Sequence, residues 1–237
     1  MLREYLQYKV LQVLFTSEYA IKLSFLGGTA LRIIYGNNRF SEDLDFDNFD
    51  LTQKEFDDLA GVVERALELE GYTVEIRTVF KKAFRCYIRF PRLLFDQGLS
   101  PIEEEKILIQ VDTYGHGYKY QPERVLLNKF DVFTEIFVTP MDILLSQKIV
   151  AALERKRAKG RDFYDIVYLL GKIKPNYDYL KFKIGVDAVA GLRRVLLEKF
   201  RGLNFDQLAK EVQPFLFVPG EVKRVELFLD YIRTASL

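Results

Sequence analysis

Residues 25–46 read Phe25-Leu-Gly-Gly-Thr-Ala-Leu-Arg-Ile-Ile-Tyr35 and, after a Gly-Asn-Asn break, Arg39-Phe-Ser-Glu-Asp-Leu-Asp-Phe46. The apolar run 23–26 predicts a strand that ends at two glycines, and the pattern over 29–35 predicts a helix. The Gly-Asn-Asn break is typical of a helix C-terminus. Residues 41–46 predict a second strand, in which Asp43 and Asp45 alternate with Leu44 and Phe46.

The acidic residues of this second strand indicate metal chemistry. Asp43 and Asp45 are two residues apart, so on a strand both side chains lie on the same face. A pair of carboxylates on one face can bind a divalent cation beside an anionic group. Taken alone, the pair is more readily explained as two surface residues of an edge strand, because this spacing is common.

The turn Gly27-Gly28-Thr29 adds a second feature to the same region. A glycine-rich turn at the start of a helix presents backbone N–H groups that bind phosphate. Alone, such a turn is equally consistent with simple loop flexibility. Within one short stretch, however, the turn and the carboxylate pair together indicate nucleoside triphosphate chemistry.

A third carboxylate, Asp112, lies near the end of the strong strand signal over 106–113. If that strand lies beside 41–46, three carboxylates converge and repel one another unless a cation binds. Two Mg²⁺ ions, with Mn²⁺ as the alternative, would satisfy them and bridge the phosphates of a nucleotide. We therefore predict Asp43, Asp45 and Asp112 as metal ligands, with Asp112 also accepting the proton of an attacking hydroxyl.

The rest of the chain predicts an α+β protein in two parts. Up to residue 138 the signals are an opening helix over 2–20, a helix from about 50 to 70, strands over 72–79 and 83–90 that suit a hairpin, and one or two strands over 125–138. After Thr139-Pro140 the pattern is helical, over 141–157, 161–170, 186–200, 205–215 and 221–236. We expect an N-terminal mixed sheet flanked by helices in residues 1–138 and a helical bundle in 139–237 that completes an active-site cleft.

Composition excludes several kinds of site. The 237 residues carry 35 basic and 34 acidic side chains, so a nucleic-acid contact must come from a local patch. One Cys (Cys86) and one His (His116) exclude an intrachain disulfide and an all-protein Cys/His zinc site. No apolar run reaches the roughly 20 residues of a membrane span, and no secretory signal is visible. We therefore expect a cytoplasmic protein without a membrane partner.

The helical half contains further candidates. Lys148 lies among apolar helical neighbours, where a lysine either reaches an anionic partner or extends to solvent. Arg155, seven residues on, is expected on the same helix face. A basic cluster follows, which is either a solvated helix end or a landing patch for the phosphates of an acceptor: Lys156, Arg157, Lys159 and Arg161.

Two acids begin the next predicted helix. Asp162 is favourably placed at the positive end of the helix dipole, which requires no functional role. Asp165 is four residues from Arg161 and could simply pair with it.

These motifs resemble a known family. Gly27-Gly28-Thr29-Ala30 followed by Arg39-x-Ser41-x-Asp43-Leu44-Asp45-Phe46 resembles the first motif of the nucleotidyltransferase superfamily with the DNA polymerase β-type fold. Leu145-x-x-Lys148-Ile-x-Ala151-x-x-x-Arg155 and Arg161-Asp162-Phe-Tyr-Asp165-Ile resemble the lysine-containing and Arg-Asp-containing motifs of its AbiEii/AbiGii toxin branch. The resemblance spans residues 20–170, and the C-terminal helices match only in general character.

The resemblance implies metal-dependent transfer of a nucleotidyl group from an NTP, with RNA, plausibly tRNA, as acceptor and a cognate antitoxin as partner. It favours a phosphate contact for Lys148, which Arg155 could join, and a functional acid in the later motif, for which we prefer Asp162. Asp43, Asp45, Asp112, Lys148 and Asp162 are thus the predicted catalytic residues.

The residues of the first motif can be given roles on physical grounds. Gly27 and Gly28 would let the backbone approach the triphosphate. The hydroxyls of Thr29 and Ser41 would donate to it, and Arg39 would neutralise its charge.

Three functions remain open at this point. The first is the RNA-modifying toxin enzyme. The second is an antibiotic-type nucleotidyltransferase that modifies a small hydroxylated molecule, which a deep acidic acceptor pocket would favour over an open basic groove. The third is a catalytically silent member that binds nucleotide or a partner protein without turnover. The intact pair Asp43 and Asp45 argues against the third.

Overall fold

The computed structural model describes all 237 residues, which form two compact units. The first unit contains residues 1–34, 42–117 and 121–139, and the second contains 35–41, 118–120 and 140–237. The chain passes into the second unit for good after Thr139, one residue from the boundary expected from the sequence. The segments 35–41 and 118–120 lie within the N-terminal half of the sequence but belong to the helical unit.

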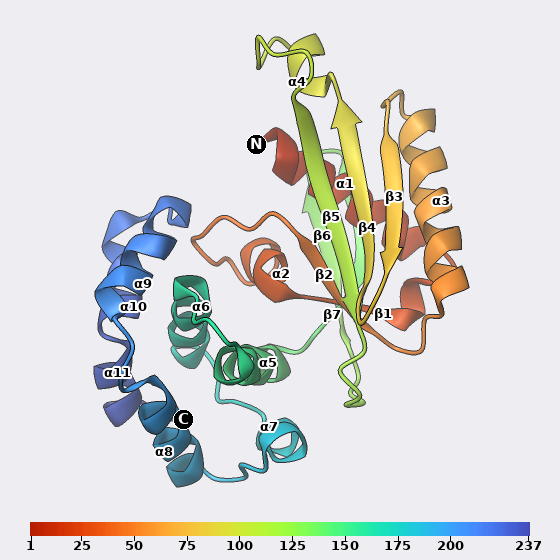
Figure 1. Cartoon of the computed structure of the whole chain (residues 1–237). Helices are drawn as coiled ribbons and strands as arrows, with labels where there is room; N and C mark the ends of the chain where they lie inside the picture. The colour runs from red at the N-terminus through yellow and green to blue at the C-terminus, as the bar shows by residue number, and fades with distance from the viewer. The chain divides into compact units, whose positions relative to one another are not determined.

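The first unit is built on a seven-stranded mixed sheet (Figure 1). Its strands lie in the order β3-β4-β5-β2-β1-β7-β6. The pairs β2–β5 and β1–β7 are parallel, and the other neighbours are antiparallel. The bounds are β1 Leu23–Leu26, β2 Leu44–Asn48, β3 Glu75–Phe80, β4 Phe84–Pro91, β5 Lys106–Tyr114, β6 Glu123–Lys129 and β7 Val132–Val138. The expected mixed sheet with flanking helices is confirmed.

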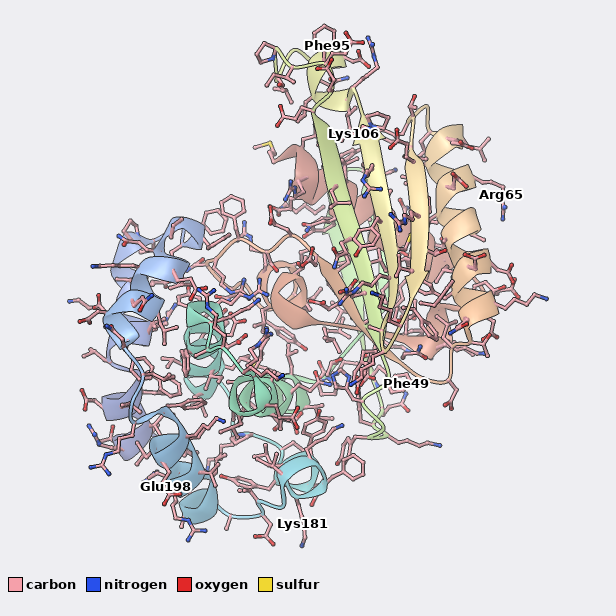
Figure 2. The ribbon with its side chains drawn as sticks, viewed as in Figure 1. Phe49, Arg65, Phe95, Lys106, Lys181 and Glu198 are labelled. Atoms are coloured by element: carbon pink, nitrogen blue, oxygen red, sulfur yellow. The ribbon has the colours of Figure 1, made fainter.

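Two helices, α1 (Leu2–Thr16) and α3 (Gln53–Leu69), pack against the sheet and against each other. Their buried side chains meet the apolar residues of the central strands and form the core of this unit. A capping box starts α3, because Thr52 and Glu55 each accept a hydrogen bond from the other's backbone N–H. Figure 2 shows Arg65 projecting from α3 away from the sheet. The remaining elements are η1 (Ala20–Lys22), α2 (Gly27–Ile33) and α4 (Leu93–Asp96).

The regular elements of the second unit are all helices. Its core contains edge-to-face aromatic contacts around Phe163, whose ring centroid lies 4.9 Å from that of Phe200 and 4.8 Å from that of Phe228. Gly160 lets helices approach closely, since a Cβ there would lie 2.0 Å from the carbonyl oxygen of Leu208. The elements are α5 Met141–Glu154, α6 Gly160–Leu170, α7 Tyr177–Ile184, α8 Val189–Phe200, α9 Phe205–Val212, η2 Gln213–Phe215, η3 Pro219–Val222, α10 Lys223–Glu226 and α11 Phe228–Thr234. No helix of the chain is long and apolar enough to cross a membrane.

Backbone hydrogen bonds tie residues 38–40 to residues 215–217 inside the second unit. The Phe40 N–H donates to the Phe215 carbonyl at 2.7 Å, and the Phe217 N–H donates to the Asn38 carbonyl at 3.0 Å. An isolated antiparallel bridge joins Arg39 to Leu216 between them. This pairing links positions far apart in sequence and, together with the contacts of Asn37 and Arg39 with Asp165, holds the segment 35–41 in the helical unit.

Several element ends differ from expectation. The opening helix stops at Thr16, and β2 begins at Leu44, so Asp43 precedes the strand. The final helical pattern, 221–236, is divided among three short helices. Helix α5 ends at Glu154, and Arg155 has an extended backbone with ψ of 133°. Arg155 is the C-cap residue of α5, and its N–H still donates to the Ala151 carbonyl at 3.1 Å, so the expectation that it shares a helix face with Lys148 stays a prediction. Five positive charges crowd residues 155–161, and like charges four residues apart disfavour a continuing helix.

Candidate active site

The glycine turn and the first acidic strand are closely fitted to each other. Gly27 has a φ of +81°, in the left-handed region that favours glycine. A Cβ at this position would lie 2.2 Å from Oδ2 of Asp45, so any side chain would collide with that carboxylate. The β1–β2 register places Asp45 opposite Leu26, the residue before the turn. Gly27 is thus required both by its backbone conformation and by the approach of Asp45.

Strands β2 and β5 bring two of the predicted carboxylates side by side. Asp45 and Asp112 are register partners on these parallel strands, so their side chains leave the same face of the sheet. The inferred pairing of the two strands is confirmed. Asp43 lies one residue ahead of β2, and its charge acts on the carboxyl of Asp112.

Asp112 has two partners that sequence reasoning missed. Nε2 of Gln110, two residues earlier on β5, lies 3.0 Å from both carboxylate oxygens. Nε of Arg85, its register partner on β4, lies 3.4 Å from Oδ2. Burial raises the pKa of the Asp112 carboxyl above its usual value. Gln110 and Arg85 oppose that shift, and the charge of Asp43 adds to it.

The other predicted residues of the first motif are Gly28, Thr29 and Ser41. Gly28 is buried in the first turn of α2. Thr29, expected to donate to a triphosphate, is fully buried, and its hydroxyl donates to the main-chain oxygen of Asp43 at 2.5 Å. In this structure Thr29 therefore positions the residue before β2. Ser41 is half-buried and ends the segment 35–41 of the second unit.

The carboxylates of Asp43, Asp45 and Asp112 suit a hard divalent cation, since Mg²⁺ prefers oxygen ligands. Strand register places the last two beside each other, and repulsion from Asp43 reaches Asp112. The three are not gathered as ligands, because no group of three or more His, Cys, Asp or Glu side chains is placed to hold a metal ion. The three carboxylates have the chemistry that Mg²⁺ prefers, and the strand register sets two of them side by side. Metal binding stays a prediction.

In the second unit, the fully buried Asp165 joins three partners. Nε and a terminal nitrogen of Arg39 each lie 2.6 Å from one of its oxygens, which is a bidentate contact. Nζ of Lys148 lies 2.9 Å away, and Nδ2 of Asn37 donates at 3.0 Å. Burial alone would raise the pKa of Asp165. Arg39 and Lys148 outweigh it and hold the pKa at about 2.

This network gives Arg39 a different environment from the one expected. Only 3% of its side chain is exposed, and Asp165 neutralises its charge. Lys148 also binds Asp165 but keeps 14% of its side chain exposed. The alternative that Asp165 pairs with Arg161 is wrong. The apolar neighbours of Asp165 on α6 are a sequence signal for its role, because an acid on a buried face needs a cation.

Asp162 belongs to a separate ion pair near the start of α6. Its Oδ2 lies 2.7 Å from Nε of Arg155, with 3% and 35% of the two side chains exposed. The two acids of the Arg-Asp motif thus have different partners. Asp162 holds the residue that follows α5, and Asp165 holds Arg39 and Lys148.

A family model described as "Nucleotidyl transferase AbiEii toxin, Type IV TA system" matches residues 9–212. The chain belongs to this AbiEii family. It is therefore a nucleotidyltransferase of a toxin family, as its motifs led us to expect. No functionally curated protein matches it.

Two solved structures from Helicobacter pylori share the fold of this AbiEii chain. JHP933 is 16% identical, with a TM-score of 0.58, and the match covers 97% of this chain and 90% of that one. A second protein, described as a candidate nucleotidyltransferase, is 17% identical, with a TM-score of 0.59 and coverage of 97% and 92%. At these identities the likeness shows the fold alone.

Sequence reasoning also missed the pair that Asp47 and His116 form in this AbiEii chain. Asp47 follows Asp45 on the same face of β2 and is 1% exposed. Its Oδ1 accepts the backbone N–H of His116 at 3.1 Å and lies 3.2 Å from the His116 Nδ1. The alternation Asp43-x-Asp45-x-Asp47 was the visible signal that the acidic face extends beyond the motif.

Proposed function

We propose that this AbiEii protein transfers a nucleoside monophosphate from an NTP to an RNA acceptor, with tRNA as the expected class, in a reaction that needs a divalent metal. The observation that carries the proposal is the pairing of Asp45 with Asp112, with Gly27 pressed against Asp45. This combines a carboxylate site with a backbone turn in one unit. The family match supports an NTP as the nucleotide donor.

Asp43, Asp45 and Asp112 would hold Mg²⁺, or Mn²⁺ in its place. Bound there, the ion would neutralise charge on the triphosphate. Thr29 fixes the main chain at Asp43, while Gln110 and Arg85 hold the carboxylate of Asp112. Asp112, which the strand register sets beside Asp45, is the proposed base that takes the proton of the acceptor hydroxyl.

In the second unit, Lys148 and Arg155 are the proposed phosphate contacts. Arg39 and Asp165 act as positioning residues, because their bidentate contact is buried and fixes the carboxylate that Lys148 binds. Asp162 positions Arg155 in the same manner. Arg39 is not among the proposed phosphate contacts, since its side chain is buried and its charge is neutralised by Asp165.

An RNA acceptor is supported by the charge between α5 and α6. Residues 155–161 hold five basic side chains, and Lys156, Arg157 and Arg161 are exposed. The repulsion of Arg161, followed by burial and Arg155, lowers the pKa of Lys159, as expected for a crowded cationic patch. A patch of this kind binds phosphates of a polyanion more readily than a small hydroxylated molecule. This is why we favour RNA over the antibiotic-type acceptor.

The family description, a Type IV toxin–antitoxin system, supports a cognate antitoxin as a genetic partner. We propose that the protein acts in the cytoplasm, where NTPs and tRNA are found together.

The test is incubation of the protein with each labelled NTP, Mg²⁺ and total cellular RNA. We expect label in the tRNA fraction, loss of transfer when EDTA is added, and loss of transfer in Asp45→Asn. The variant Asp96→Asn, an exposed acid on α4, is the matched control and should transfer normally. Label in a small hydroxylated molecule and in no RNA would overturn the acceptor assignment. Full transfer by Asp45→Asn would overturn the site.

A further inference from the structure

We propose that Phe40 and Phe217 form a platform on which the base of the NTP stacks. This inference rests on the proposed function, because it assigns a site to part of that substrate. Both rings belong to the second unit, and their centroids lie 4.4 Å apart with an interplanar angle of 41°. The two residues are 50% and 41% exposed, which is unusual for a paired set of large aromatic side chains.

The platform is held rigidly. Two backbone hydrogen bonds and the isolated bridge between Arg39 and Leu216 tie the segment 38–40 to the segment 215–217. Phe40 directly follows Arg39, whose guanidinium makes two 2.6 Å contacts with the buried Asp165. A rigid aromatic surface loses little conformational entropy when a ligand stacks on it.

The same network connects the platform to the proposed phosphate contact. Lys148 binds the carboxylate that anchors Arg39, so Lys148 and Phe40 are fixed in one frame of the second unit. An NTP has a charged triphosphate and an apolar, flat base. A lysine and an aromatic pair held in one frame match these two ends of the molecule.

The chemistry of the surface favours a base over an RNA backbone. Phe215 and Val218, which neighbour Phe217 in sequence, are also apolar and are 45% and 47% exposed. A backbone-tracking groove would need positive charge beside the aromatic rings. Phenylalanine stacks on any base and offers no hydrogen bond to read it, so we expect all four NTPs to bind here with similar affinity.

The absence of tryptophan from the chain makes the proposal directly testable. Phe217→Trp places the chain's only tryptophan on the platform, where it can be excited separately from the tyrosines, and Phe182→Trp, at a 57% exposed position on α7, is the matched control. We expect ATP to quench and shift the emission of Phe217→Trp but not that of Phe182→Trp. Inorganic tripolyphosphate, which has no base, should leave both unchanged. An equal fluorescence change with tripolyphosphate would overturn the proposal. A fluorescence change with RNA and none with ATP would overturn it too.

A second pair of variants measures the affinity. Phe40→Ala should weaken ATP binding, measured by equilibrium dialysis, roughly 5- to 100-fold and leave tripolyphosphate binding unchanged. Phe182→Ala should bind ATP as the wild type does. Unchanged ATP affinity in Phe40→Ala would contradict the platform. These binding measurements need no turnover. A protein that stacks ATP but transfers nothing therefore refutes only the proposed function, and one that transfers normally with Phe40→Ala refutes only the platform.

Discussion

Asp165 carries a full charge with no access to solvent, and that charge is sustained by Arg39 and Lys148. Removing one partner of a buried pair leaves the other charge uncompensated, which costs more than the pair itself contributes. The residue therefore links the stability of the second unit to the placement of its candidate nucleotide contacts.

Asp165→Asn should lower the free energy of unfolding by about 3–5 kcal/mol at pH 7, because Arg39 and Lys148 lose their counter-charge. The pKa of Asp165 is held at about 2, below its value in the unfolded chain. Its contribution is therefore present above about pH 4 and is lost as the pH falls toward 2. Urea unfolding at a series of pH values checks both points. A wild type and variant that differ by a constant amount from pH 7 to 2 would contradict the assignment.

The pKa shift of Asp112 changes stability with pH in the opposite direction. Its pKa is raised, so its ionised form costs stability once the pH exceeds the unfolded value of about 4. Asp112→Asn should accordingly raise the melting temperature at pH 7, with the gain vanishing below about pH 4, and should abolish transfer. Thermal unfolding measures the expected gain in melting temperature, and the RNA-labelling assay measures the expected loss of transfer. A lower melting temperature at pH 7 would show that the contacts with Arg85 and Gln110 outweigh the burial.

At the scale of elements, the turn between β1 and α2 is the most constrained feature. Gly27→Ala adds a methyl group against Asp45 and strains a backbone with φ of +81°. Gly71→Ala is the matched control, because Gly71 has φ of +90° but no atom within 4 Å of an added Cβ. We expect both variants to lose about 1 kcal/mol from backbone strain, and Gly27→Ala to lose more. Equal losses in urea unfolding would show that the approach of Asp45 is not limiting.

The strands were easier to predict from the sequence than the residues that lie beside one another across them. The segments that became β1, β2 and β5, the last of which carries Asp112, were visible in alternation and apolar runs. The register that sets Arg85 beside Asp112 was not, because cross-strand pairing depends on the turn geometry and packing of the whole sheet. Asp165 was ranked below Asp162 because its partner Arg39 lies 126 positions away, and the apolar neighbours of Asp165 indicate that it needs a cation without indicating which one.

At the scale of the whole molecule, the chain is neither basic nor acidic, yet its charges are unevenly distributed. The net charge is +1, while residues 155–161 alone carry five basic side chains. The division into units also escapes the linear pattern. Residues 35–41 follow the glycine motif in sequence but fold with helices that lie more than 100 residues further on. The backbone pairing with 215–217 and the contacts of Asn37 and Arg39 with Asp165 explain this, and residues 215–217 carried no signal of it.

The basic cluster should control RNA binding through counterion release. Lys156→Glu with Arg157→Glu should weaken tRNA binding and lower the slope of log K against log salt concentration by roughly 1 to 2. Lys181→Glu with Lys199→Glu, at exposed positions on α7 and α8, keeps the same change in net charge. Filter binding across a salt series makes the comparison. If the two double variants behave alike, net charge and not this cluster governs the interaction.

The most direct test of nucleotidyl transfer uses the position of the label on the NTP. The wild type should move label from the α-phosphate into tRNA, release the γ-label as pyrophosphate, and do neither when Asp45 is changed to Asn. Transfer of the γ-label into RNA, or α-label transfer that survives Asp45→Asn, would contradict a nucleotidyltransferase centred on Asp45 and Asp112.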